Sequence, residues 1–182
     1  MQLPPHFQQV FSGEQIDEAV KRMGRAISVW AEEVWQSSHT EILTIPVLRG
    51  AIFFYADLVR AITRSVEIAP TRTWAYEDNA VQRSDLRMHL DEVPAAGRAV
   101  LIVDDICDTG RTLEKLSQGL KAAGAREVRS AVMVRRILDT QTFKPDWQGF
   151  EYPGAEWLVG YGMDDNNQFR NLHQICAIRQ VG

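Results

Sequence analysis

A strand-like apolar run that ends in acids and a small-residue turn carries the residues best suited to chemistry in this chain. Val100–Val103 is apolar, Asp104 and Asp105 follow it, and Thr109–Thr112 reads Thr-Gly-Arg-Thr. The pattern predicts a buried strand, a short loop and the start of a helix. The unpaired backbone N–H groups and the dipole at a helix start favour an anion, so a phosphate fits there.

The residue types in the turn support phosphate binding. Gly110 lets the main chain approach an anion closely, and the hydroxyls of Thr109 and Thr112 add donors with little bulk. Arg111 contributes its backbone N–H to the same cradle.

The acids before the turn suggest the other half of a ligand. Asp104 and Asp105 repel a phosphate, but they accept hydrogen bonds from vicinal hydroxyls, either directly or through a metal shell. A phosphate beside a diol describes ribose 5-phosphate. The alternative is a buried strand that merely ends in acids, with Asp108 as part of a solvated loop or of a receiver-like metal site.

Strands and helices that would position this run alternate along the chain. Ser12–Gln15 has the form of a capping box, and apolar residues at helical spacing follow it. The predicted strands are 41–48, 66–69, 98–104, 128–134, 156–161 and 174–178, and the later helices are 51–62 and 110–123. This order predicts a parallel sheet with its site at the carboxyl edge. The last two strands either extend the sheet or form a separate cap.

Length and composition limit the class of protein. With 182 residues, the chain suits a single domain over 1–182. The net charge is −4 and basic residues are interleaved with acids, which argues against nucleic acid as a partner. Two distant cysteines, Cys107 and Cys176, suit a reducing cytoplasm. No stretch approaches the roughly 20 apolar residues of a membrane span, so we expect no membrane partner.

Further motifs extend the pattern over most of the chain. They are Val47–Gly50, Val100–Thr112, Lys144–Phe150, Trp157–Tyr161 and Asp164–Arg170. The second resembles the signature for 5-phosphoribosyl 1-pyrophosphate (PRPP) of type I phosphoribosyltransferases, and together they resemble hypoxanthine-guanine phosphoribosyltransferases over about residues 40–180. The resemblance implies an α/β fold with a central, mostly parallel sheet flanked by helices and a small hood from chain-terminal segments.

The resemblance also implies a reaction of purine salvage. The enzyme would join N9 of a 6-oxopurine, hypoxanthine or guanine, to C1′ of PRPP, giving inosine or guanosine monophosphate (IMP or GMP) and pyrophosphate. Mg²⁺ would accompany PRPP, and members of the family usually form homodimers or homotetramers. Because the transition state has oxocarbenium character, catalysis would depend on positioning and on neutralising the leaving pyrophosphate.

Site residues follow from the match to the family's motifs. Asp104, Asp105, Asp108 and Thr109–Thr112 would bind the ribose and 5-phosphate, Arg49, Gly50 and Arg170 the pyrophosphate, and Lys144, Trp157, Leu158 and Asp164 the purine.

The purine roles are distinct. By resemblance, the ammonium of Lys144 would donate to the purine O6 and disfavour the amino group of adenine. Trp157 would stack on the base, and the backbone of Leu158 would read its Watson–Crick edge. Asp164 would be the magnesium ligand, with its carbonyl near the 2-amino group of guanine.

Asp108 lies between the diol-binding acids and the phosphate turn, close to where C1′ would meet the purine N7. The matching residue of the family is the proposed general base or proton carrier, and a carboxylate there would also stabilise positive charge on the ring. The alternative is a helix N-cap without chemistry, because Asp is a favoured cap. In the family, the loop at Arg49 and Gly50 often contains a non-proline cis peptide, whose presence the sequence does not predict.

Other functions and one segment stay open. A phosphoribosyltransferase for xanthine or another base would keep these motifs, whereas a PRPP-sensing regulator of RNA would need a basic face. An inactive scaffold would not need acids at 104, 105 and 108. The polar pattern of residues 70–92 predicts a long mobile loop with one hairpin, and such a loop would close the site as a lid. The family's lid carries a Ser-Tyr pair, to which Thr71–Asp78 cannot be aligned.

Overall fold

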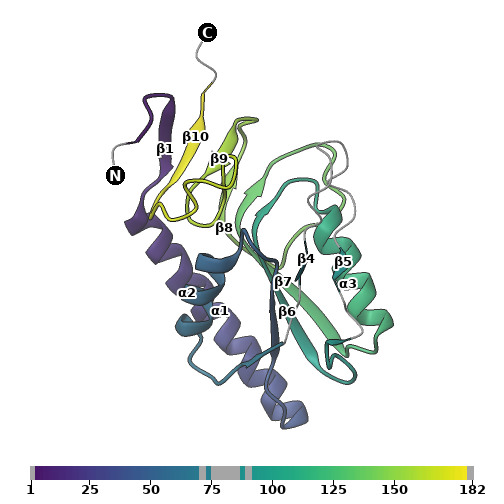
Figure 1. Ribbon diagram of the computed structural model, residues 1–182. Helices are drawn as coiled ribbons and strands as arrows, with labels where there is room; N and C mark the ends of the chain where they lie inside the picture. Colours follow the sequence, from purple (N-terminus) through teal and green to yellow (C-terminus); the bar gives the residue numbers. More distant parts are fainter. Residues whose placement is uncertain (1–2, 70–72, 75–86, 89–91, 180–182) are drawn as a thin grey trace.

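The residues described by the computed structural model, 3–69, 73–74, 87–88 and 92–179, include a central sheet of five strands (Figure 1). Neighbouring strands are all parallel, in the order β3-β2-β6-β7-β8. The strands are β2 (Leu43–Pro46), β3 (Glu67–Ile68), β6 (Ala99–Cys107), β7 (Glu127–Arg136) and β8 (Trp147–Tyr152). Strands 2, 3, 6 and 7 match the predicted alternation, which confirms the parallel α/β sheet.

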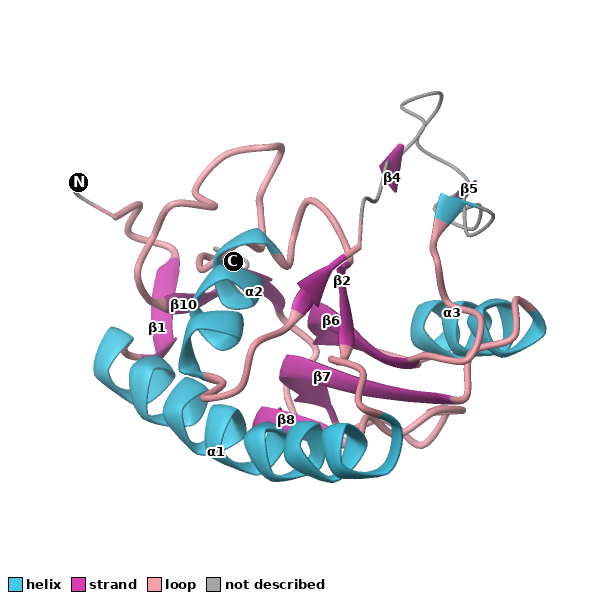
Figure 2. Cartoon of the chain, turned by 90° about the horizontal axis from the view of Figure 1, so that it is seen from below, coloured by secondary structure: helices cyan, strands magenta, loops and turns pink. Residues whose placement is uncertain are grey.

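Helices pack on both faces of the sheet (Figures 1 and 2). They are α1 (Gly13–Ser38), α2 (Ile52–Ala61) and α3 (Arg111–Ala122). Leu101 and Val103 of β6 join the core beneath α1 and α2, whereas Val100 and Ile102 join the core beneath α3. This alternation is expected of a strand that is buried on both faces.

The first helix begins as its sequence predicts. The Gln15 N–H donates to the Ser12 hydroxyl at 3.2 Å, and the Ser12 N–H donates to the Gln15 side-chain oxygen at 2.8 Å. Two backbone donors that the helix leaves unpaired are thereby satisfied.

A smaller antiparallel sheet forms the predicted hood. It contains β1 (Phe7–Phe11), β10 (Ile175–Ile178) and β9 (Trp157–Val159), in the order β1-β10-β9. The two chain-terminal segments therefore lie side by side (Figure 1). Of the two alternatives left open for the last strands, a separate cap is correct.

The sequence pattern predicts neither β1 nor β8. β1 alternates weakly, with both of its glutamines exposed, and is held by pairing with β10. β8 is interrupted by Gly149, whose backbone lies so close to the Met133 carbonyl oxygen that an added Cβ would be 2.7 Å from it. Pairing across the sheet, which no local pattern reports, determines both strands.

Part of the predicted lid segment is described. β4 (Thr73–Trp74) pairs antiparallel with β5 (Arg87–Met88), as one hairpin requires. Residues 70–72, 75–86 and 89–91 lie outside the described residues, and the prediction of a mobile, site-closing loop falls there. In the part of the chain that is described, no helix is long and apolar enough to cross a lipid bilayer.

Candidate active site

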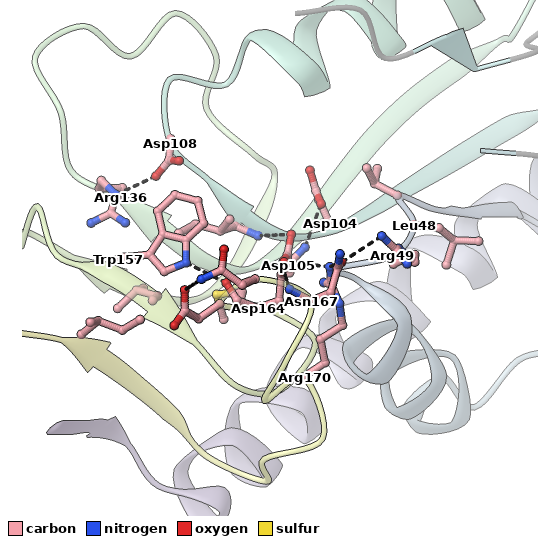
Figure 3. Close-up of a pocket in the computed structure, with 18 residues that line it drawn as sticks. Leu48, Arg49, Asp104, Asp105, Asp108, Arg136, Trp157, Asp164, Asn167 and Arg170 are labelled. Carbon is pink, nitrogen blue, oxygen red and sulfur yellow. Dashed lines mark hydrogen bonds and ion pairs between the residues drawn. The ribbon is translucent and has the colours of Figure 1, made fainter. Parts of the chain in front are cut away.

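The loops that follow β2 and β6 leave the sheet together and meet the hood. β2 ends at Pro46, beside Val103, whereas β6 continues to Cys107, so the loop after β2 lies beside the last residues of β6 at the carboxyl edge. A cavity with a volume of about 950 Å³ lies between these loops and the hood (Figure 3). Its lining residues are Val47–Gly50, Asp104–Ile106, Asp108, Arg136, Trp157, Leu158, Met163–Asn167, Arg170 and Ile178.

Asp104 and Asp105 lie in the middle of this cavity (Figure 3). The Asp105 N–H donates to Asp104 Oδ1 and the Ile106 N–H donates to Asp105 Oδ1, both at 2.9 Å. Burial, and then the charge of Asp105, raises the pKa of Asp104 well above its ordinary value, and burial also raises the pKa of Asp105. Hydroxyl donors from a bound diol would replace the hydration that these carboxylates have lost.

The raised pKa of Asp104 predicts a pH-dependent cost in stability. A carboxyl that holds its proton more tightly in the folded state makes the free energy of unfolding fall as pH rises from the unfolded to the folded pKa. We therefore expect Asp104→Asn to raise the Tm of the ligand-free protein more near pH 8 than near about pH 4, the ordinary pKa of Asp. Each kcal/mol corresponds to about 2–4 °C in Tm.

Calorimetry at the two pH values tests this expectation. Asp139→Asn is the control, because Asp139 is exposed. Equal Tm shifts for Asp104→Asn at both pH values would contradict a burial cost.

The loop after β2 packs against Asp105 and the hood without room for side chains. A Cβ on Gly50 would overlap the Asp105 carboxylate, and a Cβ on Gly162 would overlap the Gly50 carbonyl oxygen. Gly162 also has φ of +105°, which L-residues rarely adopt. The Leu48–Arg49 peptide in this loop is cis. Two glycines thus fix the approach of the loop to the acids.

Two guanidinium groups lie together at one end of the cavity (Figure 3). Arg49 Nη2 donates to Asn167 Oδ1 at 3.0 Å, and Arg170 Nη2 donates to the same oxygen at 3.4 Å. Arg170 also donates through Nη1 to the Gly162 carbonyl at 2.6 Å, and it forms an ion pair with Asp164 at 2.7 Å. The arrangement suits an anion with several oxygens.

Trp157, Asp108 and Arg136 gather at the other end (Figure 3). The indole is 47% exposed, and its Nε1 donates to the Asp164 carbonyl oxygen at 2.7 Å, which fixes the orientation of the ring. Leu158, beside it in β9, is buried. An indole face at a cavity wall offers a stacking surface for a planar ligand.

Arg136 is a buried cation that connects the central sheet to this end of the cavity. Its Nε donates to Asp108 Oδ1 at 2.6 Å. Its Nη1 donates to the Gly154 carbonyl, and its Nη2 donates to the Glu156 carbonyl at 3.2 Å. The guanidinium thereby orients the Asp108 carboxylate toward the start of β9.

The turn after β6 has the geometry of a helix start. Gly110 is the N-cap of α3 with φ of 84°, and the first intrahelical bond runs from the Glu114 N–H to the Gly110 carbonyl at 2.9 Å. A Cβ on Gly110 would lie 2.7 Å from the Phe143 backbone oxygen. Since Gly110 is the cap and the Asp108 side chain pairs with Arg136, the interpretation of Asp108 as a helix cap is wrong.

The structure brings most of the predicted site residues together. Those that line the cavity are Arg49, Gly50, Asp104, Asp105, Asp108, Trp157, Leu158, Asp164 and Arg170. Thr109–Thr112 do not line it and continue from its edge into α3. Lys144 is exposed and is not a lining residue.

Four polar residues that line the cavity are not among the predicted site residues: Arg136, Asp165, Asn166 and Asn167. Arg136 lies two residues beyond the predicted end of its strand, and its signal was its position at the carboxyl end of a strand next to β6. Asn167 follows Asn166, and both have positive φ. An Asn pair indicates a left-handed turn but gives no sign of the two arginines that meet there.

The chain is similar to known proteins over most of its length. The profile of the family described as "Phosphoribosyl transferase domain" matches residues 13–166. A hypoxanthine-guanine phosphoribosyltransferase of Bacillus subtilis is 30% identical over 93% of this chain and 92% of that protein. The enzyme of the same name from Schistosoma mansoni is 34% identical over 155 residues. The matched part is 79% of this chain and 54% of that longer protein.

A solved structure gives the same similarity at the level of the fold. The hypoxanthine-guanine phosphoribosyltransferase of Bacillus anthracis matches with a TM-score of 0.77 and 27% identity, covering 94% of this chain and 98% of that one.

Proposed function

Because the chain belongs to the phosphoribosyl transferase domain family, we propose that it makes IMP or GMP from PRPP and a 6-oxopurine in purine salvage. One observation carries the proposal. A single cavity holds a pair of arginines at one end, an indole and a cation at the other, and two acids between them. These are the groups that a pyrophosphate, a purine and a ribose require.

A spectrophotometric assay tests the substrate class. The enzyme is given PRPP and Mg²⁺ with hypoxanthine, guanine, xanthine or adenine in turn. Turnover of hypoxanthine or guanine is expected, and turnover of adenine alone would contradict the proposal. Xanthine turnover would extend the substrate range to the alternative that the motifs leave open.

The PRPP half of the site is assigned to the last residues of β6 and to the loops after β2 and β6. Asp104 and Asp105 accept hydrogen bonds from the ribose hydroxyls, and the helix start at Thr109–Thr112 binds the 5-phosphate. Arg49, the amide of Gly50 and Arg170 bind the pyrophosphate. The two guanidiniums neutralise the charge that develops on the leaving group, which is the main electrostatic requirement of the reaction.

Asp108 is assigned to the reacting centre. N9 of the purine forms a bond to C1′ as the bond from C1′ to the pyrophosphate oxygen breaks, and the purine gives up one proton. The Asp108 carboxylate, oriented by Arg136 at 2.6 Å, accepts that proton and faces the positive charge on the ribose ring. Trp157 stacks on the base, and the backbone of Leu158 reads its Watson–Crick edge.

We propose Arg136 as a second candidate, beside Lys144, for the donor to the purine O6. Arg136 lines the cavity with Trp157 and Asp108, whereas Lys144 is exposed and outside the lining. Three of the five N–H groups of the guanidinium are engaged by described residues. A guanidinium donates well to adjacent O6 and N7 atoms of a purine and repels the amino group of adenine.

Paired substitutions separate the two candidates for this role. Arg136→Gln is expected to raise KM for hypoxanthine by roughly tenfold or more, because it removes a contact worth about 1–3 kcal/mol. It is also expected to reduce the discrimination against adenine. Lys144→Gln serves as the comparison. Steady-state kinetics on both bases decide the assignment, because a loss of discrimination in Lys144→Gln alone would return the role to Lys144.

Mg²⁺ is proposed as the ion that accompanies PRPP. Asp164 offers a carboxylate at the pyrophosphate end, where one oxygen pairs with Arg170 and the other accepts the Asn167 N–H at 2.7 Å. Each carboxylate oxygen keeps a second lone pair, and Mg²⁺ needs only one or two carboxylates beside substrate oxygens and water. The residues therefore fit the ion, which would screen the pyrophosphate charge when bound.

Oligomeric state, compartment and partners are the remaining expectations. Ile52 and Phe53 are large apolar side chains exposed in the first turn of α2, and such a surface supports contact with other copies in a homodimer or homotetramer. Cys107 and Cys176 form no disulfide, which supports a reducing cytoplasm. The net charge of −4 argues against binding to nucleic acid. An RNA-binding regulator is therefore the less favoured function.

A further inference from the structure

The turn after β9 of the hood contains three consecutive residues with positive φ. Gly160, Tyr161 and Gly162 have φ of 101°, 49° and 105°. Glycine adopts such a backbone without a steric cost, but a bulky aromatic residue rarely does. Contacts of the Tyr161 side chain therefore have to hold this backbone in place.

Burial and one hydrogen bond hold Tyr161. The residue is 3% exposed and belongs to the core beneath α1 and α2. Its hydroxyl donates to Asp57 Oδ2 of α2 at 2.8 Å. Burial, and then the hydrogen bond to Asp57, raises the pKa of Tyr161 well above its ordinary value, so the phenol keeps its proton and stays the donor. The hydroxyl thus ties the turn to α2.

The same turn also touches the chain just before α2. A Cβ on Gly162 would overlap the Gly50 carbonyl oxygen, so the two backbones are in close contact. α2 begins at Ile52, and Asp57 lies in its second turn. The turn therefore contacts one short stretch of chain at two points, at Gly50 through Gly162 and at Asp57 through Tyr161. Two points fix the orientation of that stretch, whereas the backbone contact alone would let it pivot.

We propose that Tyr161 is a positioning residue that, through its hydrogen bond to Asp57, holds the loop at Arg49 and Gly50 in place for pyrophosphate. The inference rests on the proposed function, because it assumes that this loop binds the pyrophosphate of PRPP. Neither Tyr161 nor Asp57 is among the described residues that line the cavity. Tyr161 therefore acts through the loop and does not touch the substrate.

A hydrogen bond that only adds stability is the competing explanation. In that case Tyr161→Phe, which keeps the ring, lowers Tm and leaves ligand affinities unchanged at temperatures well below Tm. A positioning role predicts a selective loss instead. Pyrophosphate depends on the loop, whereas ribose 5-phosphate is assigned to the end of β6 and the start of α3. Titrations with these two ligands therefore separate the explanations.

Calorimetric titration with inorganic pyrophosphate in Mg²⁺ buffer, and separately with ribose 5-phosphate, gives the test. Tyr161→Phe is expected to weaken pyrophosphate binding by roughly threefold to tenfold, the scale of one hydrogen bond. The affinity for ribose 5-phosphate should change by less than about twofold, because its site lies outside the loop. Asp57→Ala removes the acceptor and should match Tyr161→Phe. The double variant should bind no more weakly than either single variant, because both remove the same bond.

Two further variants serve as controls. Asp57→Asn keeps an oxygen for the phenol but removes the ion pair with Arg60, whose Nη1 lies 3.8 Å from Asp57 Oδ1. It should bind pyrophosphate within about twofold of the unsubstituted protein, because an exposed ion pair contributes little. Tyr152→Phe removes a matched bond, from the Tyr152 hydroxyl to Glu156 at 2.8 Å, in a strand separated from β2 by β6 and β7. It should leave pyrophosphate binding unchanged.

Unchanged pyrophosphate binding in Tyr161→Phe and Asp57→Ala would overturn the positioning role. An equal loss for both ligands, or an equal loss in Tyr152→Phe, would overturn it as well. If the unsubstituted protein binds no pyrophosphate, the proposed function fails and the inference fails with it.

Discussion

Asp108→Asn is expected to lower kcat by roughly 10²- to 10⁴-fold, the scale of general acid–base assistance, while changing KM for PRPP little. The amide keeps the shape of the side chain and an oxygen for Arg136, whose Nε lies 2.6 Å from Asp108 Oδ1. It cannot accept the purine proton or oppose positive charge on the ribose. The loss therefore belongs to the chemical step and not to binding.

Asp108→Asn is measured by steady-state kinetics together with direct titration of PRPP. Asp105→Asn provides the contrast, because it changes a carboxylate assigned to the ribose hydroxyls and should raise KM for PRPP. Equal losses of kcat and PRPP affinity in Asp108→Asn would assign Asp108 to positioning and contradict a role in proton transfer.

Gly162→Ala is expected to be the most disruptive small substitution near the site. Its Cβ would overlap the Gly50 carbonyl, and its φ of +105° disfavours an L-residue. Overpacking alone costs about 1–3 kcal/mol, and movement of the loop would displace Arg49. We expect a lower Tm and a rise of at least about tenfold in KM for PRPP, in line with the loss of one charge-assisted contact.

Gly97→Ala is the matched control for this substitution. Gly97 also has positive φ, at 72°, but no described atom lies within 4 Å of the position that its Cβ would take. It shares the backbone penalty without the overlap, so it should lower Tm and leave KM for PRPP unchanged. The prediction for Gly162 is wrong if the two variants have the same KM.

Local and contiguous features were predictable from the sequence. Val100–Thr112 carries strand, acids and helix start in one uninterrupted run, and the strand and helix follow with ends shifted by a few residues. The motifs also predicted the family, which the similarity to known proteins confirms. The parallel sheet followed from the alternation of strands and helices, and the hood from the resemblance.

Features that depend on pairing between distant segments were not predictable. β8 exists because it pairs with β7, and its own pattern of burial is irregular. Arg136 enters the cavity because β7 continues beside β6 as far as Arg135 opposite Cys107, beyond the apolar run that marks the strand. Lys144 precedes β8 and its side chain is exposed, so its role at the purine stays a prediction.

A structure of the enzyme with bound IMP would show whether one cavity binds both substrates, with Asp108 at the point where they join. We expect the 5-phosphate on the N–H groups of Thr109–Thr112 and the ribose hydroxyls on Asp104 and Asp105. We expect the base to stack on Trp157, with N7 facing Asp108 and O6 facing Arg136. A nucleotide bound with its base away from Trp157 and Asp108, or with its phosphate at Arg49 and Arg170, would contradict these assignments.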